Sequence, residues 1–554
     1  MKRLSLVLVL LLLVALPLTV LGQDDATLVI RGFGNITTFN PALSSSGADV
    51  QAYGPLFPKP FETDRFTGEP VPGLTTWEIS DDGLVYTFHI NEDAFWSDGT
   101  PITSNDMKFV IEAVQQEENA TDWEGEVALI ESVNVIDEKT YEIIMSQVNC
   151  AAMYDLGSLR FLPAHKFAAD FSDFMDSPFN MNPDVSGGPY ILEEWAPDEF
   201  QRYRANPTYW RGEPPIPNLV NRLIGEEAVA MQSIQAGEID YSYFQGDSFA
   251  QIADRDGLQW EIFPRLSVNF LALNWVDPNT PVSAYDADGN LVEQAPHPIF
   301  SDINVRKAVA MGYNKQDILA TLGGPEGGSL VTGAVAPQVA WAINTDIQPY
   351  PYDPDAAAAL LDEAGWVMNE DTGIREKDGV PLAFTINYSD ILLYFETTAF
   401  VIQDQLGDIG FDVTLNKQEW GDYIEQTYLG QQFDATPMSN SGGGGGPPDP
   451  SEFMSLLDSR EDVVGSGNNP TSYVNPEVDA LIDQGRSLPG CDRDERAAIY
   501  KEIQAITYDD VAYDWTVNPN LFQTANIRVE NFNPGPSWVF YGYTDYLWEW
   551  ALGG

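Results

Sequence analysis

The sequence predicts an α/β protein with mostly parallel sheets, organised in two or three domains. Short apolar strands alternate with helical segments through the second half of the chain, and this order produces such sheets. Hydrophobic residues make up 44% and aromatic residues 12% of the 554 positions, which is enough for large packed cores. The length also exceeds the usual size of a single domain.

The first half of the chain favours strands, with one capped helix between them. An apolar strand begins at Thr27 and leads into a glycine-containing loop, and residues 84–90 (LVYTFHI) alternate as a half-buried strand does. Residues 133–145 (VNVIDEKTYEIIM) predict a hairpin with an Asp-Glu-Lys turn. The polar residues 104–106 precede an apolar helical face over residues 107–114, as expected at the start of a helix.

The second half of the chain alternates between helix and strand. The segments that carry this pattern are 305–322 (two helical parts with a break), 353–366 (a helix), 382–388 (a strand) and 398–418 (a helix, then a strand). Asp353-Pro354 suits a helix start, and Gly365 suits a helix end. The run Gly442–Gly446, followed by two prolines, predicts a loop.

Two carboxylates in the stretch AFWSDGTPITSNDMKF (94–109) raise the question of a paired-carboxylate active site. Such a pair would need a nucleophile or a substrate cleft nearby, and the surrounding sequence supplies neither. Asp98 lies in a Ser-Asp-Gly turn after a predicted strand, and Asp106 lies at the start of a predicted helix. We therefore expect structural roles for both residues, and no catalytic residues in the chain.

The first 22 residues have the pattern of a secretory signal. A basic start is followed by an apolar run from Leu4 to Leu21, and we expect cleavage after Gly22. An uncleaved anchor is the alternative, because 18 mostly apolar residues just suffice to span a bilayer. No Cys lies near the cleavage site, so a bacterial lipoprotein is not expected. The mature protein should be exported, to the periplasm or the cell-surface space.

The charge balance excludes nucleic acid as a partner. The chain has 84 acidic residues against 27 basic ones, a net charge of −57. Such a surface repels nucleic acid and anionic lipid.

The two cysteines, Cys150 and Cys491, could form a disulfide in an oxidising compartment. The sequence does not show whether their backbones come within bridging distance, so the pairing stays open. Neither cysteine has a spaced partner of the kind that binds metal, and His89, His165 and His297 stand apart from one another. We therefore expect no direct metal site and no cofactor.

Seven sequence blocks occur in a specific order along nearly the whole mature chain. They are 68–109 (GEPVPGLTTW to SNDMKF), 186–195 (SGGPYILEEW), 204–215 (RANPTYWRGEPP), 234–244 (IQAGEIDYSYF), 302–319 (DINVRKAVAMGYNKQDIL), 352–366 (YDPDAAAALLDEAGW) and 475–487 (NPEVDALIDQGRS). Each block alone is a weak signal, but their order and spacing are specific. Together they resemble the extracellular solute-binding proteins of family 5, the oligopeptide- and dipeptide-binding components of ABC importers.

The resemblance implies a two-lobed fold of the periplasmic-binding-protein kind (type II, cluster C-like), with three domains and a hinge of two crossing strands. The implied parts are a discontinuous first lobe of residues 24–54, 186–269 and 518–554, an inserted domain of residues 55–185, and a second lobe of residues 270–517. The crossings are expected near residues 267–275 and 513–520, where apolar runs change into polar ones.

The resemblance also implies a function without catalysis. Two lobes close over a ligand, and the closed form is recognised by a membrane permease whose ATPase supplies the energy. The chain has no Gly-x-x-x-x-Gly-Lys motif of its own, so we do not expect it to hydrolyse nucleotide. A monomer is expected. A receptor for a sensor, a secreted hydrolase that uses two carboxylates and a carrier of metal chelates remain as alternatives.

The ligand is left open between an oligopeptide and an oligosaccharide. Peptide-binding relatives supply an acidic side chain for the peptide ammonium, and the matching loop, residues 438–453, places Gly446 at that position. A buried ammonium without a counter-charge is costly, although Asp434 or Asp422 could replace the missing carboxylate. A neutral sugar would instead suit aromatic faces and the polar residues 439–441.

The family pattern gives a set of candidate ligand contacts. They lie in the loop after the first strand, at the exit of the hinge, at two aromatic residues of the second lobe and around the start of the glycine run. The candidates are Phe33, Gly34, Asn35, Asn274, Trp275, Trp420, Tyr423, Asn440, Ser441 and Gly442.

Overall fold

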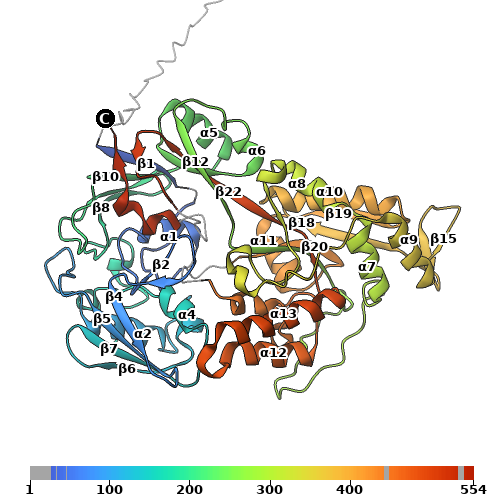
Figure 1. Ribbon diagram of the computed structural model, residues 1–554, viewed down its shortest axis with the longest axis horizontal. Coiled ribbons are helices and arrows are strands. Elements are labelled where there is room, and N and C mark those ends of the chain that lie inside the picture. Colours follow the sequence, from blue (N-terminus) through green and yellow to red (C-terminus); the bar gives the residue numbers. More distant parts are fainter. Residues whose placement is uncertain (1–25, 33, 45, 442–447, 535–541, 554) are drawn as a thin grey trace, which may run out of the picture.

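The computed structural model describes residues 26–32, 34–44, 46–441, 448–534 and 542–553, which form two lobes side by side (Figure 1). The expected signal of residues 1–22 and the glycine run 442–446 lie outside the described residues. Among the described residues, no helix is both long and apolar enough to cross a membrane.

The first lobe is built on a mixed sheet. Its strands, in spatial order, are β12 (Leu258–Pro264), β22 (Val517–Asn526), β11 (Tyr241–Phe244), β1 (Thr27–Gly32), β10 (Asn218–Leu223), β9 (Phe200–Ala205) and β8 (Tyr190–Ala196). The apolar strand expected from Thr27 is β1, and it lies near the middle of this sheet. The helices α5 (Glu227–Ala236) and α6 (Gly246–Phe249) lie beside β12 at one end of the lobe (Figure 1).

The segment between β1 and β8 adds a four-stranded antiparallel sheet to the first lobe. Its strands are β4 (Thr75–Ile79), β5 (Val85–Ile90), β7 (Thr140–Met145) and β6 (Ile130–Val135). The strand expected at 84–90 is β5, and the expected hairpin is β6 with β7, so both predictions are confirmed. Its helices α2 (Ser104–Val114) and α4 (Ala152–Ser158) lie close by (Figure 1).

The second lobe has a five-stranded sheet of its own. The strand order is β19 (Asp412–Lys417), β18 (Ala383–Tyr388), β20 (Ala435–Ser441), β13 (Ser267–Leu273) and β21 (Asp514–Trp515). The helices predicted from sequence are confirmed as α7 (Ile303–Gly312), α8 (Lys315–Thr321), α9 (Pro354–Glu363) and α10 (Leu393–Gly407). Two further helices, α12 (Pro476–Ser487) and α13 (Arg493–Asp509), complete the lobe on the side nearest α4 (Figure 1).

The two large sheets are mixed and the sheet of β4 to β7 is antiparallel, so the prediction of mostly parallel sheets was wrong. In the second lobe β18 pairs in parallel with β19 and β20, whereas β13 pairs antiparallel with both β20 and β21. The reason is that β13 and β21 belong to the two segments that cross between the lobes, since β13 follows β12 of the first lobe and β21 leads into β22. Their direction follows these crossings and not a helical connection between neighbouring strands of the sheet.

The two carboxylates of residues 94–109 have the structural roles expected of them. Asp98 accepts a hydrogen bond from the Thr100 N–H in a turn. Asp106 is buried, and it accepts from the N–H of Thr103 at 2.7 Å and from the N–H of Ala164 at 3.0 Å. The helix begins at Ser104, three residues earlier than predicted, so Asp106 lies in its first turn.

A disulfide joins Cys150 and Cys491, with a Cα–Cα distance of 5.3 Å. The question left open by the sequence is therefore answered. Cys150 lies two residues before α4, and Cys491 lies between α12 and α13.

The carboxyl group of Asp155, on α4, lies in an unfavourable electrostatic environment. Its Oδ2 accepts from the Asn149 side-chain amide at 2.7 Å. Burial raises the pKa of Asp155 from its ordinary value of 3.8 to about 7, and the negative charges of Glu126 and Asp449 act in the same direction. Between these pH values the folded protein therefore binds more protons than the unfolded chain.

We expect Asp106→Ala to lower the free energy of unfolding by about 2–3 kcal/mol, because two backbone N–H groups lose a buried carboxylate as their acceptor. Asp98→Ala, at an exposed turn, should cost less than about 1 kcal/mol. Urea denaturation of both variants measures the difference. Equal losses would contradict the structural role assigned to Asp106.

The raised pKa of Asp155 also predicts a pH dependence of stability. Its contribution should fall as the pH rises from 3.8 to about 7, because ionising a buried carboxyl is unfavourable. In Asp155→Asn this part of the decline should disappear, and the unfolding free energy measured between pH 4.5 and 7.5 should be flatter than in the parent. Parallel curves for the two proteins would rule the effect out.

Candidate functional site

Two short segments connect the lobes and form the hinge. The chain passes from β12 of the first sheet to β13 of the second over residues 264–267, and it returns between β21 and β22 at Thr516. The side chain of Asn518 contacts the other segment twice, donating from Nδ2 to the Arg265 carbonyl at 2.9 Å and accepting at Oδ1 from Ser267 at 2.8 Å. Both crossings lie within or beside the stretches predicted from sequence.

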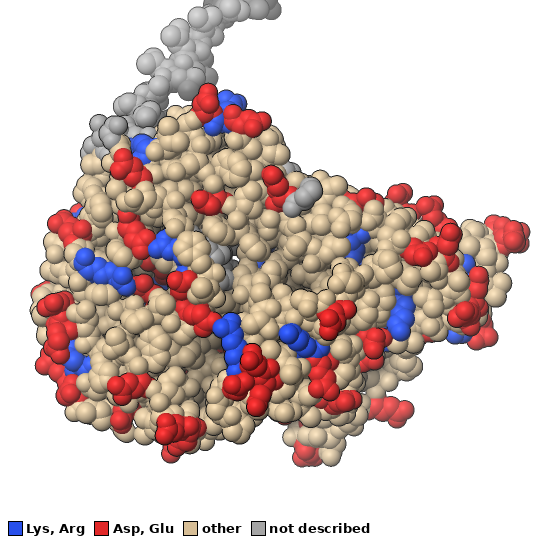
Figure 2. Space-filling view, viewed as in Figure 1, with Lys and Arg blue, Asp and Glu red and all other residues tan. Residues whose placement is uncertain are grey.

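The strand β22 belongs to both lobes. Its first residues pair with β14 (Gly328–Leu330), and Val517 lies in the hydrophobic core of the second lobe. Further along, Phe522 pairs with β11 and β12 and packs in a core of the first lobe. The surface is indented along the line where the lobes meet (Figure 2). The hinge and this indentation define the candidate ligand cleft.

On the first-lobe side, the loop after β1 is held by one buried carboxylate. Asp49 is fully buried and accepts from the N–H and hydroxyl of Thr37 at 2.6 and 2.8 Å, and from the Thr38 N–H at 3.3 Å. The hydroxyls of Ser44 and Ser46 also donate to it, at 2.5 and 2.8 Å. This network fixes the backbone that presents the candidates Gly34, half-buried, and Asn35, exposed. The candidate Phe33 lies outside the described residues.

Two arginines place positive charge beside the hinge, and the sequence analysis did not single them out. The guanidinium of Arg31 is buried and donates to the carbonyl oxygens of Ile224 and Tyr243, at 3.0 and 3.3 Å. Burial lowers the pKa of the Arg265 guanidinium from its usual value, while the neighbouring Tyr394 and Tyr243 oppose this shift. The sequence signal that could have pointed to these arginines is the rarity of basic residues, since the chain has only 27 Lys and Arg among 554 residues.

On the second-lobe side, Trp420 and Tyr423 form a rigid aromatic pair. Their rings stack with centroids 5.6 Å apart and planes 18° apart. Tyr423 is almost fully buried, and its hydroxyl bonds with the Thr436 hydroxyl at 2.9 Å and the Pro437 carbonyl at 2.6 Å on β20. Trp420 is 42% exposed. Trp420 is therefore available to a ligand, whereas Tyr423 supports it from behind.

The candidates at the end of β20 lie beside the hinge. Asn440 pairs with Val268 and Ser441 with Ser267, at the start of β13. Asn440 is half-buried and Ser441 exposed. Gly442 and Gly446 lie outside the described residues.

The structure places Asn274 and Trp275 away from the hinge. They follow the last residue of β13, about 20 Å along the strand from Ser267 at 3.3 Å per residue. Asn274 is fully buried and donates to two backbone carbonyls, at 3.1 Å each. The Arg306 guanidinium lies 3.7 Å from the Trp275 ring centroid. Both side chains are therefore committed within the second lobe, and we leave them out of the proposed site.

The carboxylates considered as replacements for the missing acidic residue differ in availability. Asp434 is engaged at both oxygens, by His297 Nε2 at 3.2 Å and by the Thr385 N–H at 2.8 Å. Asp449, from the Asp-Pro pair of the loop, forms a two-point ion pair with Arg496 at 2.8 and 2.9 Å. Of the two candidate replacements, Asp434 and Asp422, the latter is exposed and its carboxylate is therefore the more accessible one.

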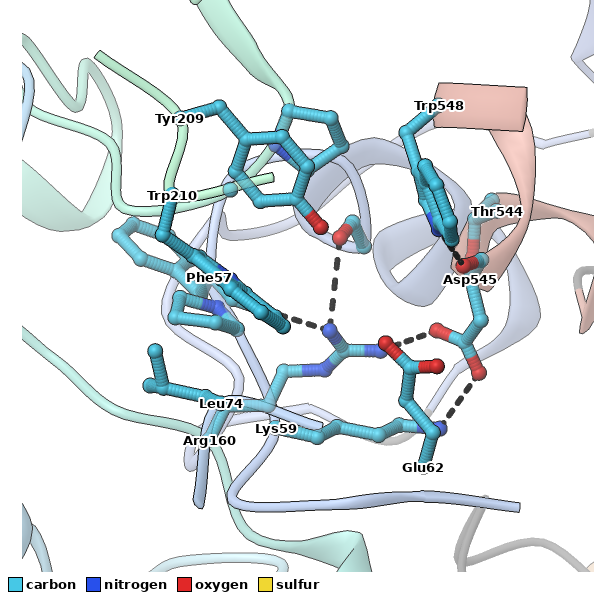
Figure 3. Close-up of a pocket in the computed structure, with 14 residues that line it drawn as sticks. Phe57, Lys59, Glu62, Leu74, Arg160, Tyr209, Trp210, Thr544, Asp545 and Trp548 are labelled. Carbon is cyan, nitrogen blue, oxygen red and sulfur yellow. Dashed lines mark hydrogen bonds and ion pairs between the residues drawn. The ribbon is translucent and has the colours of Figure 1, made fainter. Parts of the chain in front are cut away.

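A separate small cavity lies within the first lobe (Figure 3). Asp545 stands between Lys59, at 2.7 Å, and Arg160, at 3.4 Å, and the side chains of Trp210 and Trp548 line the same space (Figure 3). Its volume of about 40 Å³ has room for only a few waters. The ion pairs of Asp545 connect the C-terminal segment to the inserted one. The cavity itself is too small to hold an oligomer.

The three histidines do not form a catalytic or metal site among the described residues. His297 is buried, accepts at Nδ1 from the N–H groups of Ile299 and Phe300, and meets Asp434 through Nε2. His165 pairs with Asp98 at 2.9 Å on the surface. No group of three His, Cys, Asp or Glu in the described ranges could hold a metal ion.

Two lobes on separate sheets, two hinge crossings and a cleft between the lobes define the class of two-lobed binding proteins. A model of the bacterial extracellular solute-binding proteins, family 5 (middle part), matches residues 69–463. The chain belongs to this family, which confirms the resemblance carried by the seven sequence blocks. Proteins of this family are solute-binding proteins and not enzymes, as the resemblance implied.

Similar proteins extend over almost the whole chain. The dipeptide-binding protein of Escherichia coli (strain K12) is 24% identical over 535 residues, covering 92% of each chain. The oligopeptide-binding protein AppA of Bacillus subtilis (strain 168) is 23% identical over 528 residues, covering 93% of this chain and 90% of its own.

Solved structures share the fold. CtaP of Listeria monocytogenes, an ABC transporter substrate-binding protein, superposes with a TM-score of 0.80 at 19% identity, over 95% of this chain and 99% of its own. AppA of Bacillus subtilis in complex with a nonapeptide superposes with a TM-score of 0.75 at 22% identity. NikA of Brucella suis in complex with Fe(III)-EDTA superposes with a TM-score of 0.78 at 23% identity. Both comparisons cover 95% of this chain and 99% of the other. The two-lobed fold implied by the resemblance is confirmed.

We expect Asp49→Ala to loosen the loop after β1, because five hydrogen bonds to one buried carboxylate are lost together. Unfolding free energy should fall by about 3 kcal/mol, and amide exchange at Thr37 and Thr38 should accelerate. Ser46→Ala, which removes one of these bonds at a helix cap, should cost about 1 kcal/mol. If the amides of Thr37 and Thr38 stay equally protected in both variants, Asp49 does not hold the loop.

Proposed function

We propose that this protein captures an oligopeptide, or a similar polar oligomer, between its two lobes and delivers it to the permease of an ABC importer. The observation that carries the proposal is the two-segment hinge, which leaves a cleft with side chains from both lobes. Closure of the lobes would be driven by the ligand's higher affinity for the closed state. The chain works as an exported monomer, with the permease and its ATPase as partners.

Three features support a peptide as the ligand. Relatives named for dipeptides and oligopeptides cover more than nine-tenths of this chain. The positive charge of Arg31 and Arg265 beside the hinge favours a ligand that carries a carboxylate, which a peptide has and a neutral sugar lacks. An extended peptide can also bind through its main chain as an added strand. Asp422 would then meet the ammonium.

An oligosaccharide is the second candidate, because of the Trp420–Tyr423 pair. A flat, preorganised and partly exposed indole is a suitable face for a sugar ring. The neutral residues Ser439, Asn440 and Ser441 are the last residues of β20, the strand to which Tyr423 is hydrogen-bonded. A metal chelate has less support, since the described residues contain no metal-ligand cluster.

The proposal is tested by native mass spectrometry of protein purified from its own host, followed by calorimetry. The titrants are trialanine, a cello-oligosaccharide and the nickel–histidine complex. Binding of trialanine supports the peptide assignment, and binding of the sugar alone would replace it. Recovery of a cleaved titrant would replace the binding function by a hydrolase.

We expect Trp420→Ala to weaken binding of the recognised titrant about tenfold, or about 1.4 kcal/mol. The matched control is Phe400→Ala, which removes a 49% exposed aromatic ring from the middle of α10 in the same lobe and should leave affinity unchanged. Calorimetry measures both constants, and thermal melting checks the fold. Unchanged affinity in Trp420→Ala would remove this residue from the site.

A further inference from the structure

The disulfide between Cys150 and Cys491 connects the two lobes directly. Cys150 belongs to the segment inserted in the first lobe, and Cys491 lies between two helices of the second lobe, 341 residues further along the chain. In Figure 1, α4 meets the ends of α12 and α13 at a place well separated from the hinge strand β22. The lobes are therefore joined covalently at a third point, besides the two hinge segments.

Several non-covalent contacts near this disulfide also cross between the lobes. The N–H of Cys150 donates to the Arg486 carbonyl at 2.8 Å, and Arg496 Nη1 donates to the Cys150 carbonyl at 3.4 Å. The Tyr154 hydroxyl donates to Glu452 at 2.9 Å. The ion pair of Arg493 with Glu69, at 2.6 Å, lies further out on the surface.

The second-lobe side of this contact is rigid. Arg496 is buried and held by Asp449 in a two-point ion pair, while its Nε donates to the Gly485 carbonyl at 2.9 Å. The Arg496 guanidinium thus connects α12 and α13 to the loop that precedes Pro450. A displacement of Cys491 would therefore move the second lobe as a whole, because the residues around it are held to α12, α13 and the loop before Pro450.

We propose that the Cys150–Cys491 disulfide is a tether that limits how far the cleft opens. A hinge rotation that separates the lobes must also separate α4 from α12 and α13. A disulfide keeps the two Cα atoms within roughly 6.8 Å, so the present 5.3 Å leaves only about 1.5 Å of travel. Hydrogen bonds and surface ion pairs break and reform during such a motion, whereas the S–S bond does not.

The tether changes the motion that the hinge permits. With the lobes joined at the hinge and at the disulfide, the motion that keeps both connections is a twist about the line between them. Ligand would then enter and leave through the sides of the cleft. Reduction by dithiothreitol supplies two electrons and two protons, which convert the disulfide into two thiols while the reagent becomes a cyclic disulfide. The hinge can then open fully.

Small-angle X-ray scattering of ligand-free protein tests the tether. We expect a larger radius of gyration after reduction with dithiothreitol than in the oxidised protein, and the same increase in the double variant C150S/C491S without reductant. The control Tyr154→Phe removes a neighbouring contact but keeps the disulfide, so it should scatter like the oxidised parent and expand on reduction.

Identical scattering profiles for oxidised and reduced protein would overturn the proposal, as would expansion of oxidised Tyr154→Phe. Thiol titration confirms the redox state, and far-ultraviolet circular dichroism confirms that the reduced protein is folded. If the double variant does not fold, the reduced parent still decides the question. No ligand is used, so the result is independent of the substrate proposed above.

Discussion

The fold depends on the buried hydrogen bonds that join the two hinge segments. Asn518 donates to the Arg265 carbonyl and accepts from Ser267, while Asn269 donates to the Val517 carbonyl at 2.7 Å. Asn518 and Ser267 are fully buried, and leaving one of their polar groups unpaired would cost about 1–3 kcal/mol. The crossing therefore keeps one geometry at its centre, and any motion must occur around it. The position of each lobe, and hence of the cleft, follows from this constraint.

The cleft is bordered by side chains that are themselves held in place. The Asp49 carboxylate accepts five hydrogen bonds from residues of the loop after β1. Tyr423 is held to β20 by two hydrogen bonds of its hydroxyl and packs against Trp420. Such supports reduce the ordering that a ligand must impose on binding, which preserves affinity. The positive charge beside the hinge contrasts with the acidic residues spread over both lobes in Figure 2. A positive site within an acidic surface attracts negatively charged groups.

The inserted segment links parts of the molecule that are distant in sequence. It contacts the C-terminal residues of the first lobe through the Asp545 network, and it reaches the second lobe through Cys150. These two attachments connect the motion of the lobes to the position of the insert. A structure with this third connection exchanges ligand under tighter geometric limits than one with a hinge alone.

Much of the fold could be predicted from the sequence, because helix and strand periodicity and caps such as Asp353 are local signals. The order of seven blocks also identified the family. The direction of β13 was not predictable, since it depends on the crossing between lobes. Burial separates the candidate contacts into two groups. Tyr423 and Asn274 have suitable side chains but are buried, whereas Asn35, Trp420 and Ser441 are exposed. The sequence by itself determined the local elements and the family. Only the tertiary structure brought Cys150 to Cys491 and two arginines to the hinge, because proximity across hundreds of residues is set by packing and not by neighbouring residues.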